Sequence, residues 1–187
     1  MRPLLAVSGS LRKDSFNTRL AQCARDLVAP SIPVQVVTLH GIPLYDGDLE
    51  AGSGVPDAVE ALRGRIVGSA GVMLFSPEYN NGIPGVFKNA IDWLSRPSDR
   101  IAEVFVGRPF AVAGASPGGF GTVMAQAAWL PVLRALGVQA WAGGRVLLSR
   151  AGSAFDEAGR LVEPRTRDQL REFVEGFDAF CRARERA

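Results

Sequence analysis

Near its start the chain reads Leu4-Leu5-Ala6-Val7, then the polar run Ser8-Gly9-Ser10-Leu11-Arg12-Lys13-Asp14, then Ser15-Phe16-Asn17-Thr18-Arg19-Leu20. The first run is apolar without alternation, which is typical of a strand covered on both faces. Ser15 is a good N-cap residue for a helix, because a serine oxygen can accept a hydrogen bond from an N–H of the first turn. The stretch therefore predicts a strand, a polar loop and a helix, the first unit of a parallel α/β fold.

The same alternation of short apolar runs and helix-period segments continues along the chain. The predicted strands are Leu4–Val7, Val34–Val37, Val72–Phe75, Phe110–Ala113 and Val146–Leu148. Strands that alternate with helices favour a parallel sheet with helices on both faces. At this length we expect one flavodoxin-like domain over residues 1–187, a three-layer α/β sandwich with a five-stranded parallel sheet in the order 2-1-3-4-5.

Three stretches show no clear periodicity and predict loops: 46–54, 98–107 and 151–164. The third contains Asp156-Glu157-Ala158-Gly159-Arg160, which is typical of a turn in a small hairpin. Pro131 lies inside a helical pattern, where we expect it to kink or restart the helix. Pro84 suits the first position of another helix, where its missing N–H has no partner to lose.

Composition excludes several classes of protein. The chain has 21 Lys and Arg against 19 Asp and Glu, a net charge of +2, and its basic residues are scattered, so nucleic-acid binding is not expected. No apolar stretch could span a bilayer, and the first apolar run is too short for a signal peptide, so we expect a cytoplasmic protein. The two cysteines, Cys23 and Cys181, have no histidine at ligand spacing, and His40 is the only histidine, so we expect no metal site and no disulfide.

The predicted strand order locates a crevice. In this order strand 2 lies on one side of strand 1 and strand 3 lies on the other. The loops after strands 1 and 3, 8–18 and 76–84, therefore diverge at the carboxyl ends of the strands. The first loop offers Ser10, Arg12 and, at the helix start, Ser15 and Asn17, donors that suit one terminal phosphate. The same residues fit an ordinary strand-to-helix turn with a serine cap equally well.

The other two loops are polar or rich in glycine. Loop 76–84 carries carbonyls, amides and Tyr79, groups that could bond the edge of a planar heterocycle, although alone it is more typical of a long surface loop. The loop 114–121 has four glycines and includes Gly-x-Ser-x-Gly around Ser116, the pattern of a hydrolase nucleophile. Such a hydrolase needs a histidine after its serine, and His40 precedes Ser116, so the sequence does not favour this activity.

Together these segments resemble one family, the NADPH-dependent FMN reductases, and within it the branch that reduces quinones, chromate and azo dyes. The residues that carry the resemblance are Gly9–Asn17, Pro43–Asp46, Ser76–Asn80, Lys88–Pro97 and Ser116–Gly121. The sequence departs from the family pattern at Met124, where the family often has arginine, and at Trp129, where another residue type is expected.

The resemblance implies a flavodoxin-like homodimer or homotetramer that binds FMN non-covalently. The implied cofactor-binding residues are Ser10, Arg12, Ser15, Phe16, Asn17, Pro77, Glu78, Tyr79, Asn80, Ser116, Gly118 and Gly119. Hydride would pass from NADPH or NADH to the flavin, and electrons then to a quinone, an azo compound, chromate or free flavin.

Hydride transfer between two stacked rings depends on positioning, so no catalytic acid or base is named. We expect the Glu78 carboxylate to bond loop backbone and Tyr79 to control access to the ring. The alternative is a flavodoxin-type electron carrier without its own NAD(P)H turnover. The balanced charge of +2 and Arg12 in the first loop speak against that alternative.

Overall fold

The computed structural model describes residues 1–185 and contains a parallel sheet in the order β2-β1-β3-β4-β5, with β6 also paired to β4. The strands are β1 (Leu4–Ser8), β2 (Val34–Thr38), β3 (Gly71–Phe75), β4 (Pro109–Ala115), β5 (Gln139–Ala140) and β6 (Val146–Leu148). Strand β1 pairs with both β2 and β3, so the strand order changes direction at β1, inside the sheet. The predicted flavodoxin-like order is confirmed.

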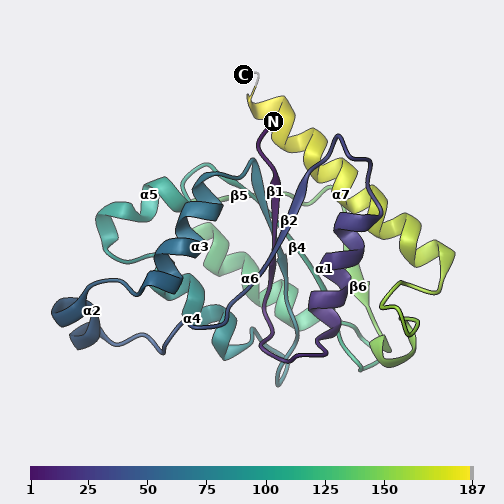
Figure 1. Cartoon of the computed structure of the whole chain (residues 1–187), viewed down its shortest axis with the longest axis horizontal. Helices are drawn as coiled ribbons and strands as arrows, with labels where there is room; N and C mark the ends of the chain where they lie inside the picture. Colours follow the sequence, from purple (N-terminus) through teal and green to yellow (C-terminus); the bar gives the residue numbers. More distant parts are fainter. Residues whose placement is uncertain (186–187) are drawn as a thin grey trace.

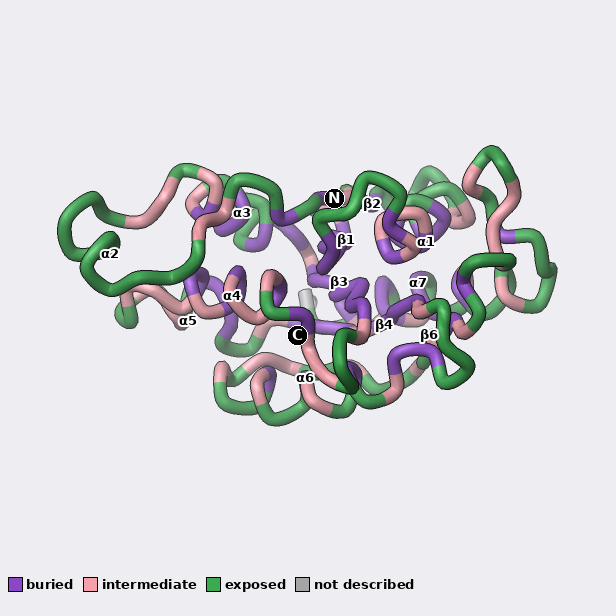
Figure 2. Tube along the Cα trace, turned by 90° about the horizontal axis from the view of Figure 1, so that it is seen from below, coloured by how far each residue is buried: buried purple, intermediate pink, exposed green. Residues whose placement is uncertain are grey.

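Helices cover both faces of the sheet (Figures 1 and 2). On one face lie α1 (Phe16–Asp26) and the long α7 (Pro164–Glu185), and on the other lie α3 (Asp57–Val67), α4 (Gly85–Leu94) and α6 (Val123–Ala135). The short elements are α2 (Gly47–Ser53), α5 (Ile101–Val104) and the 3-10 turns η1 (Ser98–Arg100) and η2 (Ala151–Ser153). Helix α2 projects from the body of the molecule (Figure 2).

The two faces explain why the strands are apolar without alternation. Leu4 and Ala6 of β1 belong to the core under α1 and α7, whereas Leu5 and Val7 belong to the core under α3, α4 and α6. All five residues of β1, and all five of β3, are buried. Because the first four residues of β1 each belong to the core on one face or the other, none of these four positions favours a polar side chain.

The structure corrects several local expectations. The predicted five-stranded sheet misses β5, which has only two residues. Stretch 46–54 contains α2, capped by the Asp46 side chain, and stretch 98–107 contains η1 and α5, so these are not plain loops. Helix α6 continues through Pro131 without restarting, and Pro84 is the N-cap of α4 rather than its first residue. The expected turn at 156–160 is present, closed by an antiparallel bridge between Phe155 and Leu161.

Within residues 1–185, no helix combines the length and the apolar character needed to cross a membrane.

Candidate functional site

The loops that follow β1, β3 and β4 meet at the carboxyl ends of these strands and enclose a small cavity of about 50 Å³. The lining includes nine of the predicted site residues: Ser10, Arg12, Ser15, Phe16, Asn17, Pro77, Glu78, Tyr79 and Ser116. Ala115 and Pro117, which the sequence analysis did not name, also line it. Asn80, Gly118 and Gly119 lie outside this lining. The only sequence feature that could have indicated Ala115 is its position just after the end of a predicted strand.

The first loop presents hydrogen-bond donors to this cavity. Ser15 Oγ accepts a hydrogen bond from Thr18 N at 3.3 Å, which confirms the expected N-cap of α1. This bond leaves the N–H groups of Phe16 and Asn17 without an acceptor in the described part of the chain. Such free N–H groups at a helix N-terminus, with the helix dipole, favour an anion.

Arg12 adds a positive charge beside the helix N-terminus. Its guanidinium carbon lies 5.7 Å from the centre of the Phe16 ring, a cation–π contact, and its Nη2 donates to Asp14 O at 3.4 Å. His40 also steadies the loop, because its Nε2 donates to the Leu11 carbonyl at 3.1 Å. The cation therefore lies at the mouth of the cavity on an anchored loop.

Asn17 has a structural contact that the sequence did not reveal. Its side chain is 3% exposed, its Nδ2 donates to Ala115 O at 2.9 Å, and its Oδ1 accepts from Ala115 N at 2.9 Å. The carboxamide thus bonds both backbone groups at the end of β4, much as a neighbouring strand would. Asn17 fastens α1 to β4 at the wall of the cavity, and its side chain makes these bonds without any ligand.

The second loop ends in a tight turn. Tyr79 and Gly82 exchange two backbone hydrogen bonds, of 3.2 and 3.0 Å, around Asn80 and Asn81, whose φ angles are +50° and +59°. Positive φ at both central residues defines a type I′ turn, and asparagine tolerates this conformation better than most residues. The turn leaves the Tyr79 side chain 46% exposed beside the cavity.

Glu78 bonds backbone, but not the backbone of its own loop. Its Oε2 accepts hydrogen bonds from Met124 N at 2.8 Å and from Ala125 N at 2.9 Å, both in the first turn of α6. Trp129, one of the two family departures, is fully buried and its Nε1 donates to Ser76 Oγ at 3.0 Å. The second loop is therefore held by α6 at two points.

The third loop is held from the other side by the segment after β6. Ser116 O accepts from Ala151 N at 3.1 Å, and Gly118 O accepts from Arg150 N at 3.0 Å. At the start of this loop Gly114 allows Ser76 and Thr122 to approach closely, because a Cβ there would lie 2.2 Å from Ser76 O and 2.4 Å from Thr122 Oγ1.

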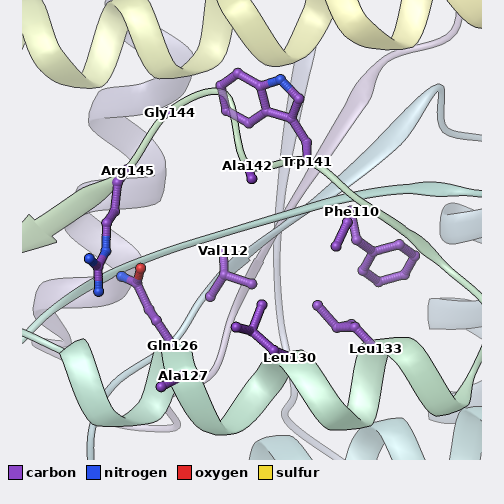
Figure 3. Close-up of a pocket in the computed structure, with 11 residues that line it drawn as sticks. Phe110, Val112, Gln126, Ala127, Leu130, Leu133, Trp141, Ala142, Gly144 and Arg145 are labelled. Atoms are coloured by element: carbon purple, nitrogen blue, oxygen red, sulfur yellow. The ribbon is translucent and has the colours of Figure 1, made fainter.

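A larger cavity, of about 300 Å³, lies elsewhere, between α6 and the segment joining β5 to β6 (Figure 3). Its walls are mainly apolar, including Phe110, Leu130 and Leu133, and its polar groups, Gln126 and Arg145, gather at one end (Figure 3). It shares no lining residue with the small cavity and has no helix N-terminus among its walls. This larger cavity is not the candidate site, because the carboxyl ends of β1, β3 and β4 and the free N–H groups of α1 lie at the small cavity.

The donor set of the small cavity fits the phosphate end of FMN. Its volume suits one compact group rather than a whole flavin nucleotide, and its polar groups are hydroxyls, helix N–H groups and the Arg12 guanidinium. The one carboxylate in the lining, that of Glu78, is bonded to α6. The second loop, with exposed Tyr79, borders this cavity.

A parallel sheet in this order, with polar loops at the switch point, defines the class of flavodoxin-like proteins. The sequence model of the NADPH-dependent FMN reductase family matches residues 3–153. An NAD(P)H-dependent FMN reductase of Pseudomonas aeruginosa is 38% identical over 179 residues, which cover 96% of this chain and 95% of that protein. A 2-hydroxy-1,4-benzoquinone reductase of a Burkholderia species is 34% identical, with 97% of each chain covered.

Solved structures agree. The flavoenzyme NAD(P)H:(acceptor) oxidoreductase FerB of Paracoccus denitrificans superposes with a TM-score of 0.85 at 32% identity, covering 98% of each chain. The chain belongs to the NADPH-dependent FMN reductase family, as the sequence resemblance predicted. This membership makes it an FMN-dependent NAD(P)H oxidoreductase, and the relatives give no support to the electron-carrier alternative.

Proposed function

We propose that this enzyme holds FMN at the small cavity and uses NAD(P)H to reduce a quinone. The observation that carries the proposal is the anion-sized cavity at the N-terminus of α1, with the second loop beside it. When bound, FMN supplies a ring that accepts hydride from NAD(P)H and passes two electrons to the acceptor. The quinone is favoured as acceptor because relatives covering nearly the whole chain are named quinone reductases.

In this proposal the residues of the chain bind and position rather than transfer protons. Ser10, Ser15 and Arg12 bind the phosphate with the N–H groups of α1, while Pro77 and Tyr79 border the ring. Glu78 is not used as a base, because its carboxylate is bonded to the first turn of α6. Tyr79, half exposed at the rim, governs which molecules reach the ring.

The test is an anaerobic titration of the purified, FMN-loaded protein with NADPH and, separately, with NADH. The visible flavin absorbance is expected to bleach with one of them and to return when a benzoquinone is added. A protein that takes up FMN but is not bleached by either nucleotide would contradict the proposed reaction.

We also propose that the protein self-associates through the exposed face of α6, as a homodimer or homotetramer. This apolar α6 face comprises Met124, Ala127, Leu130 and Pro131, and Met124 and Leu130 are 51% and 58% exposed. The cavity of Figure 3 adjoins it through Ala127 and Leu130. Exposed apolar surface of this kind favours a protein partner over water.

Light scattering after size-exclusion chromatography tests the self-association. The wild-type protein is expected to elute as a dimer or tetramer, and Leu130→Glu to shift it toward the monomer. Val162→Glu is the matched control, because Val162 is 51% exposed but lies outside the apolar α6 face. A wild-type monomer, or equal behaviour of the two variants, would contradict this interface.

We propose that the enzyme is located in the cytoplasm, which is a reducing environment. Both cysteines are buried and form no disulfide, and burial raises the pKa of the Cys23 thiol above its usual value of 9.0. Buried thiols of this kind are common in cytosolic proteins.

A further inference from the structure

Helix α6 lacks a cap of its own. The side chain of its N-cap residue, Thr122, accepts no backbone N–H of the helix and bonds the Gln126 side chain instead, at 3.0 Å, and the first turn contains no acidic residue. The first N–H groups of a helix have no partner within the helix, and the dipole at this end is positive. Without help from another segment, α6 would begin at the site with unpaired donors.

Glu78 supplies this cap from 46 residues earlier in the chain. A single oxygen, Oε2, accepts from both Met124 N and Ala125 N, at 2.8 and 2.9 Å. A charged acceptor on two N–H groups is stronger than the usual hydroxyl cap, because the negative charge also lies at the positive end of the helix. The negative charge of Glu78 thereby lies at the N-terminus of α6.

Glu78 is also one of the residues that line the small cavity, so one residue links the site to the helix. Glu78 is followed directly by the type I′ turn at Asn80 and Asn81, and Trp129 fixes Ser76 just before it. Helix α6 therefore holds the loop on both sides of Pro77.

We propose that Glu78 is a positioning residue: its bond to α6 sets the position of residues 76–79 and so prepares the FMN site before the cofactor arrives. This inference rests on the proposed function, since it assigns FMN to the small cavity. It also gives α6 a second role, because the helix that carries the apolar α6 face would fix the loop beside the ring.

The first test measures amide hydrogen exchange in the protein without FMN. Met124 and Ala125 are in the first turn of α6, where amides normally exchange fast, and the bond to Glu78 predicts that they are protected. Glu78→Ala should remove this protection, while Glu78→Gln, which keeps an oxygen acceptor but no charge, should retain part of it. Unprotected Met124 and Ala125 amides in the wild-type protein would overturn the inference.

The second test measures FMN affinity by fluorescence quenching. Loss of a side-chain cap typically lowers the equilibrium constant for forming the capped structure by about tenfold. Glu78→Ala should therefore raise the Kd for FMN by about tenfold. Glu78→Gln should recover much of this loss. The matched control is Asp46→Ala, which removes the bond from Asp48 N to Asp46 Oδ1 (2.9 Å) at the start of α2 and should leave the Kd unchanged.

The outcomes separate the inference from the proposed function. If wild-type protein binds FMN and Glu78→Ala weakens it less than fivefold, Glu78 is not a positioning residue, although the function stands. If wild-type protein does not bind FMN at all, the proposed function itself fails. If Glu78→Ala does not fold, the exchange rates of wild type and Glu78→Gln decide.

Discussion

Replacing Asn17 by alanine should destabilise the protein far more than the loss of a typical asparagine. The substitution removes both bonds to Ala115 and leaves the N–H and C=O of that residue unpaired in the interior. An unsatisfied buried backbone group costs roughly 1–3 kcal/mol, so the free energy of unfolding should fall by about 2–4 kcal/mol. For a chain of this size that loss corresponds to a decrease in Tm of roughly 5–15 °C.

Asn89 provides a matched control of the same residue type. Its Nδ2 donates to Pro43 O at 2.8 Å and its Oδ1 accepts from Tyr45 N at 2.8 Å, so it also makes two bonds to backbone. These bonds lie near the surface, where water can replace them, so Asn89→Ala should cost about 1 kcal/mol or less. Thermal and urea unfolding of both variants without FMN give the comparison. Equal losses for the two variants would refute the reasoning, because the Asn89 bonds are more exposed and Pro43 O also accepts from Trp93 Nε1 at 2.9 Å.

Two further predictions concern the stability of the protein without FMN. An alanine Cβ at Gly9 would lie 2.0 Å from the Phe87 ring, so Gly9→Ala should cost about 1–3 kcal/mol in urea unfolding, whereas Gly64→Ala, in an uncrowded helical position, should not destabilise. A destabilisation by Gly64→Ala as large as that by Gly9→Ala would count against the crowding argument. The bond from Arg96 lowers the pKa of Glu50 below its usual 4.5, so the stability that Glu50 contributes is present above pH 4.5 and is lost as the pH falls through its lowered pKa. The stability difference between wild type and Glu50→Gln should therefore be larger at about pH 7 than at about pH 3, and a difference that grows in acid would contradict this sign.

Much of the fold could be predicted because the central strands are apolar on both faces. A continuous run such as Leu4–Val7 is visible in any window of the sequence, and so are the loops that follow such runs. Helix α2 and strand β5 were missed for the opposite reason. Each is short, α2 has no buried residue, and β5 is set by pairing with β4 rather than by its own two residues.

Nine of the twelve predicted site residues line the small cavity, but the hydrogen bonds that hold this cavity could not be predicted. Asn17 was expected to face a phosphate, and Glu78 to bond nearby loop backbone, because local sequence shows only residue type and spacing. Their actual partners, Ala115 and the first turn of α6, are 98 and 46 residues away in sequence. Such pairs depend on how the loops of three strands pack against each other, and no periodicity in one segment records that.

The most direct test of the account compares the binding of FMN and riboflavin to the protein without cofactor. The two ligands share the ring and differ in the phosphate, which the account places at the N-terminus of α1 beside Arg12. One charge-assisted hydrogen bond contributes roughly 1.5–3 kcal/mol, so FMN should bind at least about tenfold more tightly than riboflavin, and Ser15→Ala should reduce that preference. Equal affinity for the two ligands would mean that the small cavity does not bind the phosphate.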